Sequence, residues 1–122
     1  MLSDPIKTLE AYVNQPSGSH DRDDVTAMAD MIAADFASLG FSVERHEFEA
    51  TGPVLVCRIG RGERQLMLMG HMDTVFPHDV AVPFTDNGDG TASGSGTSST
   101  TRYAGPNIVS LPGRTLPRES FR

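Results

Sequence analysis

The most informative segment of the chain is Gln65-Leu-Met-Leu-Met-Gly-His-Met-Asp-Thr-Val-Phe-Pro77. Its first part, Leu66 to Met69, is a continuous apolar run, which is typical of a strand that is covered on both faces. Two polar residues, His71 and Asp73, follow Gly70 at the point where this strand would end. In open α/β sheets, ligand sites gather at the carboxyl ends of the strands. The segment therefore predicts a buried strand that leads into a site.

His71 and Asp73 lie two residues apart, so in an extended chain their side chains point to the same side. An imidazole can hold a metal ion, and a carboxylate can orient that imidazole or help to bind the ion. A bare His-x-Asp is also common as a polar exit from a strand. These two residues alone do not decide between the two interpretations.

The whole segment, from the apolar run through His-Met-Asp-Thr-Val-Phe-Pro, resembles the first metal-ligand motif of the M20 family of zinc metallopeptidases. That family includes glutamate carboxypeptidase, acetylornithine deacetylase and succinyl-diaminopimelate desuccinylase. The resemblance implies that His71 is a metal ligand and that Asp73 is the catalytic aspartate beside it. It also implies two zinc ions as cofactor and a small peptide or N-acyl amino acid as substrate. The bond that the family cleaves is an amide near a free carboxylate, attacked by a metal-activated water with a glutamate as general base.

The resemblance stops within Ser93-Gly-Ser-Gly-Thr-Ser-Ser-Thr-Thr-Arg102. Gly94 and Gly96 align with two family glycines, but Ser99 stands where the zinc-bridging aspartate is expected. A neutral hydroxyl is a poor zinc ligand. Because the remaining ligands and the base also have no matching positions, we predict at most weak zinc binding and a truncated, inactive form. The alternative is a non-catalytic remnant, or an interaction piece that binds an intact homologue.

The expected fold class is α/β, as the incomplete N-terminal part of a zinc-peptidase-like catalytic domain. Apolar periodicity predicts two helices and then three strands, with the third strand forming a hairpin with the second. Ser3 is the expected N-cap of the first helix, and Asp23 or Asp24 that of the second. The predicted bounds are helices at 4–15 and 23–39, and strands at 41–49, 53–60 and 65–70.

The chain divides into residues 1–97, read as a partial M20-like domain, and residues 98–122, read as a non-homologous tail. Residues 1–90 carry 15 acidic and 6 basic side chains, whereas residues 91–122 carry 1 acidic and 4 basic. Of the 32 residues after Gly90, 18 are Ser, Thr, Gly or Pro, which predicts disorder without a stable element. Thr-Thr-Arg at 100–102 fits the codons for the family's Asp-Asp-Lys read one base late. A reading-frame shift near Ser98 is thus one hypothesis for the tail.

The composition excludes several partners. A formal charge of −6 argues against nucleic acid and anionic membranes. The N-terminus has no recognisable signal peptide, so we expect a cytoplasmic protein. The single cysteine, Cys57, lies in an apolar pattern and is interpreted as core, and His20 as a solvated loop residue. Because two helices cannot cover the apolar strand on both faces, we expect exposed apolar surface and self-association.

Overall fold

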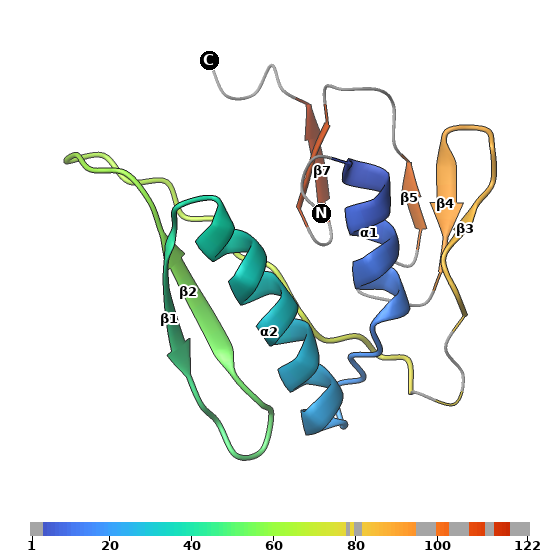
Figure 1. The fold of residues 1–122 in the computed structure, drawn as a ribbon, viewed down its shortest axis with the longest axis horizontal. Coiled ribbons are helices and arrows are strands. Elements are labelled where there is room, and N and C mark those ends of the chain that lie inside the picture. Colours follow the sequence, from blue (N-terminus) through green and yellow to red (C-terminus); the bar gives the residue numbers. More distant parts are fainter. Residues whose placement is uncertain are drawn as a thin grey trace.

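The computed structural model describes residues 4–77, 79 and 82–94, together with the backbone of three short strands further along the chain (Figure 1). Two helices come first and small antiparallel sheets follow, which makes this a mixed α/β chain. The elements are α1 (Pro5–Asn14), α2 (Arg22–Ser38), β1 (Ser42–His46), β2 (Val54–Arg58), β3 (Thr85–Asp86), β4 (Thr91–Ser93), β5 (Thr100–Arg102), β6 (Ile108–Leu111) and β7 (Arg114–Pro117).

Each helix begins at an aspartate that satisfies the free amides of the first turn. Asp4 caps α1 by accepting from the amides of Ile6 and Lys7 at 3.1 and 3.2 Å. Asp21 caps α2 by accepting from the amide of Asp24 at 3.1 Å. The predicted spans of both helices are therefore confirmed to within a residue or two. The predicted caps are wrong. The cap of α1 is Asp4, one residue after the predicted Ser3, and the predicted caps of α2, Asp23 and Asp24, lie inside its first turn, after Asp21.

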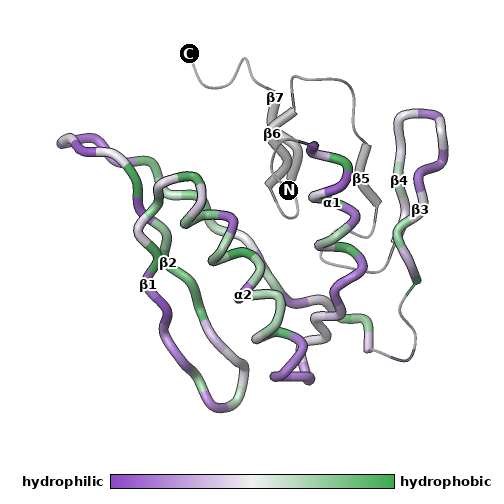
Figure 2. The backbone as a smooth tube through the Cα atoms, viewed as in Figure 1, coloured by the Kyte–Doolittle hydropathy of each residue, from purple (hydrophilic) through white to green (hydrophobic). Residues whose placement is uncertain are grey.

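The hairpin β1–β2 packs on α2. The two strands are antiparallel, with Ser42 opposite Arg58 and His46 opposite Val54. Figure 2 shows β2 as mostly hydrophobic and β1 as mostly hydrophilic, which suits a hairpin with only partial cover. The Arg58 guanidinium lies 2.8 Å from the Glu44 carboxylate across the strands, and this pairing lowers the pKa of Glu44.

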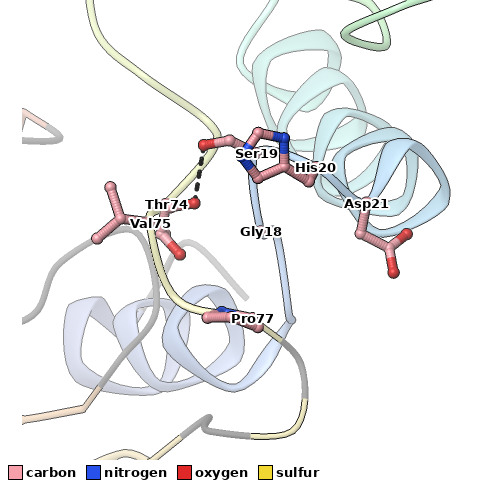
Figure 3. Close-up of a pocket in the computed structure, with 7 residues that line it drawn as sticks. All are labelled: Gly18, Ser19, His20, Asp21, Thr74, Val75 and Pro77. Carbon is pink, nitrogen blue, oxygen red and sulfur yellow. Dashed lines mark hydrogen bonds between the residues drawn. The ribbon is translucent and has the colours of Figure 1, made fainter.

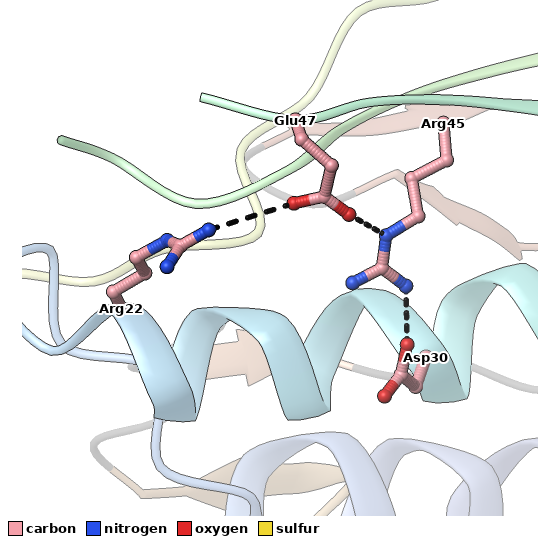
Figure 4. A network of polar contacts seen from close by, with 4 residues as sticks. All are labelled: Arg22, Asp30, Arg45 and Glu47. Carbon is pink, nitrogen blue, oxygen red and sulfur yellow. Dashed lines mark hydrogen bonds and ion pairs between the residues drawn. The ribbon is translucent and has the colours of Figure 1, made fainter. Parts of the chain in front are cut away.

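A polar network ties the hairpin to α2 (Figure 4). Arg45 on β1 pairs with Asp30 on α2 and with Glu47 just beyond the strand. Arg22, in the first turn of α2, lies 3.9 Å from the other oxygen of Glu47. Both partners of Arg45 raise its pKa. Since these side chains are largely exposed, the network orients the hairpin more than it stabilises it.

The described core is small and centres on α2. Its buried apolar side chains are Val13, Val25, Met28, Ala29 and Ala92. Tyr12 on α1 donates a hydrogen bond to Asp35 on α2, and burial is the main cause that raises the pKa of this phenol. A Cβ atom at Gly94 would overlap with the Val13 side chain on α1. Only a glycine allows the backbone to approach α1 so closely.

The predicted third strand does not form. Residues 64–70 are in no helix or strand, and the neighbour of β2 is β1. The predicted hairpin between the second and third strands is therefore wrong, whereas the first two strands are confirmed with shorter bounds. The physical reason is that an apolar run supplies side chains for a strand but cannot supply the neighbouring backbone that completes one.

The tail is described only in part. Its backbone includes β5, which pairs with β4, and the antiparallel pair β6–β7. These short strands depart from the expectation of a tail without regular elements. The other residues of 98–122, Ser99 among them, lie outside the described residues, so the predicted disorder stays a prediction. Among the described residues, no helix is long and apolar enough to cross a membrane.

Candidate functional site

The loop between α1 and α2 docks on the end of the informative segment (Figure 3). Gly18 forms a parallel bridge with Thr74. The amide of Ser19 donates to the Thr74 carbonyl at 2.8 Å, and the amide of Thr74 donates to the Ser17 carbonyl at 2.8 Å. A Cβ atom at Gly18 would lie 3.0 Å from the Phe76 carbonyl oxygen, so the close approach favours glycine. Two parts of the sequence that are far apart thus meet at backbone level.

This contact fixes Asp73. The Ser19 hydroxyl donates to Asp73 Oδ2 at 2.6 Å and also lies 2.8 Å from the Thr74 carbonyl. The hydrogen bond from Ser19 is the largest cause that lowers the pKa of Asp73. Asp73 is therefore held as an ionised carboxylate with one oxygen engaged by the loop.

The second oxygen of Asp73 faces His71. His71 Nδ1 lies 3.5 Å from Asp73 Oδ1, and the imidazole is 92% exposed while the aspartate is 40% exposed. An imidazole whose Nδ1 faces a carboxylate has its Nε2 free as a lone-pair donor. The structure thus brings together the two residues that the sequence selected, in an order Ser19–Asp73–His71. A metal ion bound to the imidazole would lie near the negative charge of Asp73.

An open pocket of about 340 Å³ lies beside this cluster. Figure 3 shows the loop on one side and residues 74–77 on the other. Its lining residues are Gly18, Ser19, His20, Asp21, Thr74, Val75 and Pro77. His20 is exposed, as predicted for a solvated loop histidine.

The described residues supply only some of the ligands that a zinc ion needs. A catalytic zinc ion normally has three protein ligands and one open position. No group of three or more His, Cys, Asp or Glu side chains that could hold a metal occurs in the described part of the chain. His71 and Asp73 supply at most two donors. Ser99, the residue at the expected bridging position, is outside the described residues.

Sequence reasoning assigned no role to either of the two serines of the loop. Ser19 positions Asp73, and Ser17 is 2% exposed, with no hydrogen-bond partner for its hydroxyl among the described residues. The signal was the Ser17-Gly-Ser19 spacing, which places two short polar side chains around a glycine that permits close approach. Its partner could not be read from the sequence, because Asp73 lies 54 residues further on.

The fold and the cluster together define a small α/β segment with an exposed carboxylate–histidine pair at the end of an extended apolar run. No protein-family model matches the chain. Over 89 residues the chain is 38% identical to carboxypeptidase G2 of Pseudomonas sp. (strain RS-16), an M20 peptidase. The match confirms the predicted resemblance to the M20 peptidases over that part of the chain. It covers 69% of this chain and 21% of the relative, so the chain spans about a fifth of the length of the curated relative.

Proposed function

We propose that this chain carries part of the zinc site of an M20-type hydrolase. Such an enzyme cleaves an amide or peptide bond next to a free carboxylate. In this proposal His71 is the metal ligand, through Nε2. Asp73 orients the imidazole through Nδ1. Ser19 is a positioning residue, because it acts on the site only through Asp73.

The observation that carries this proposal is the geometry of Asp73. One of its oxygens accepts from Ser19 at 2.6 Å while the other lies 3.5 Å from His71 Nδ1. A merely polar exit from a strand does not need a carboxylate that is engaged on both sides. Histidines that bind metals usually have such a carboxylate on the ring nitrogen opposite the metal. The similarity to carboxypeptidase G2 supports the same assignment.

We further propose that these 122 residues alone do not hydrolyse substrate. Two donors cannot complete the coordination of a catalytic zinc ion. Ser99 would bring no negative charge to the position between two cations. No glutamate of the chain corresponds to the family's general base, which must reach the attacking water to take its proton.

The test is zinc titration by calorimetry on the full chain, with an assay on several N-acyl amino acids and dipeptides. We expect zinc binding no tighter than micromolar, reduced in His71→Ala and unchanged in His46→Ala, an exposed histidine on β1 that serves as control. We expect no turnover. Submicromolar zinc binding that is lost in His71→Ala, together with measurable hydrolysis, would show a complete active site. If the two substitutions change zinc binding equally, His71 is not a specific metal ligand.

A further inference from the structure

The turn between β3 and β4 contains the one Asn-Gly pair of the sequence, Asn87-Gly88. Both residues are exposed, Gly88 has a φ of 74°, and a Cβ atom there would meet nothing within 4 Å. The backbone nitrogen that follows an asparagine can attack the carbonyl of the asparagine side chain. Because glycine has no side chain to hinder this attack, an exposed asparagine before a glycine is especially labile.

Hydrogen bonds of the turn hold both reacting groups. Asn87 Nδ2 donates to Thr91 Oγ1 at 2.9 Å, and Thr91 Oγ1 donates to Asp89 Oδ1 at 2.5 Å. The amide of Gly88 donates to Asp86 Oδ1 at 2.8 Å. The turn is also closed by the amide of Asn87, which donates to the Thr91 carbonyl at 3.0 Å. The intact turn therefore needs the side chain of Asn87 as a hydrogen-bond donor.

We propose that Asn87 is a site of self-modification, at which the backbone nitrogen of Gly88 attacks Asn87 Cγ. A bond from this nitrogen to Cγ forms and the bond from Cγ to Nδ2 breaks. The side-chain nitrogen leaves as ammonia, with the proton that the Gly88 amide loses. Water then opens the cyclic imide, adding a hydroxyl to one carbonyl and a proton to the nitrogen, and leaves aspartate or isoaspartate. Since solvent water is the only co-reactant, the reaction is independent of the proposed function.

Conversion of Asn87 removes a donor that the turn uses. A carboxylate cannot donate to Thr91, and the Thr91 hydroxyl has one proton, which it already donates to Asp89. Isoaspartate also lengthens the backbone between β3 and β4, whose register places Asp86 opposite Ala92. Ala92 is 3% exposed and belongs to the core. The modification should therefore loosen this hairpin from the core.

Peptide mapping by mass spectrometry tests the site, on the full chain incubated warm at mildly alkaline pH. We expect Asn87 to gain the mass of an amide-to-acid exchange at least about tenfold faster than Asn14 does. Asn14 is the control, because it is also exposed but precedes Gln15, and its Oδ1 accepts from the Phe84 amide at 2.8 Å. Gly88→Ala should slow the reaction at Asn87 by a similar factor. Equal rates at Asn87 and Asn14, or an unchanged rate in Gly88→Ala, would overturn the proposal.

Two matched variants test the restraint by hydrogen bonds. Thr91→Val keeps the branched shape but frees the Asn87 amide, so it should speed the reaction about threefold. Thr85→Val makes the same change on β3, outside the turn, and should leave the rate unchanged. Equal rates in the two variants would show that the hydrogen bond to Thr91 does not restrain Asn87.

The converted chain carries one further negative charge, so anion exchange separates it from the unconverted chain. We expect the converted chain to unfold at a lower urea concentration. An equal midpoint for the two forms would contradict the loosening of the hairpin.

Discussion

Two apolar stretches of this chain, Val54–Arg58 and Leu66–Met69, have similar composition but different structures. The first forms β2, pairs along its whole length with β1, and packs on α2. The second forms neither a helix nor a strand, and its side chains lie mostly in solvent. The difference shows that a neighbouring backbone, and not hydrophobicity alone, makes a strand. In this chain α2 and β1 supply that neighbourhood to one stretch and leave the other without it.

The largest expected effect comes from a substitution in the core around α2, against which β2 packs. Met28 on α2 is fully buried, so Met28→Ala should lower the free energy of unfolding by about 3 kcal/mol. Met67→Ala removes the same atoms from a side chain that is 78% exposed. It should therefore change the free energy of unfolding by less than about 0.5 kcal/mol. Urea denaturation at low protein concentration measures both. Similar losses for the two variants would mean that Met67 is covered in the monomer.

The covered parts of the fold were also the parts that the sequence predicted well. Helical spacing in 4–15 and 23–39 is a local property, and the helices follow it. The run at 65–70 carries an equally clear local pattern, but its outcome depends on partners far away in sequence or in another molecule. The His71–Asp73 pair was predictable because two residues of spacing bring the side chains together. Ser19 was not, because only the tertiary fold joins it to Asp73.

The second expected effect compares a glycine that is closely packed against α2 with one that is not. Gly52 and Gly60 both have a positive φ, of 84° and 83°. A Cβ atom at Gly52 would lie 3.2 Å from Val25 Cγ1, whereas one at Gly60 would have nothing within 4 Å. Alanine at either position incurs backbone strain of about 1 kcal/mol. Gly52→Ala should therefore be the more destabilising variant, by a further 1 kcal/mol or so, because it also crowds Val25.

Thermal and urea denaturation of the Gly52→Ala and Gly60→Ala variants give this difference directly. The subtraction removes the backbone strain that both share. If the two variants are equally destabilised, Val25 is free to move away from Gly52 without cost.

The third effect concerns the hydrogen bond between Ser19 and Asp73, which lies just after the uncovered stretch. Ser19→Ala removes the hydroxyl that donates to Asp73 and should cost about 1 kcal/mol near neutral pH. Because the native pKa of Asp73 is lowered, its contribution is present above the unfolded value of about 3.9 and is lost as pH falls through the native value. The variant should lose less stability than the wild type over this acidic range.

The measurement for Ser19→Ala is urea denaturation across a pH series from neutral to strongly acidic. Ser38→Ala serves as control, since the Ser38 hydroxyl donates to the backbone carbonyl of Asp35 and not to a titrating group. A Ser19→Ala variant with the acid dependence of the wild type would show that Asp73 is ionised for reasons other than this hydrogen bond.

The smallest expected effect concerns the ion pairs of Arg45, which join the hairpin to α2. Arg45→Gln removes the contacts with Asp30 and Glu47. Because the pairs are exposed, the cost should be only about 0.5 kcal/mol at low salt, and it should disappear at high salt. Arg61→Gln makes the same charge change at an exposed residue outside the hairpin and should leave the free energy of unfolding unchanged. A cost that persists at high salt would indicate packing by the Arg45 stem instead of charge.

The bridge between Gly18 and Thr74 also has a consequence for the order in which the chain folds. Ser19 and Thr74 are 55 residues apart, whereas the helices and the β1–β2 turn form between near neighbours. Closing so long a loop requires entropy to be lost before any contact forms, so long-range pairings are slow. The amide protons of Ser19 and Thr74 should thus gain protection later than those of the helices during refolding, and lose it earlier under mild denaturant. The carboxylate–histidine pair is thus assembled on a long-range junction, and its geometry should be lost before that of the helices.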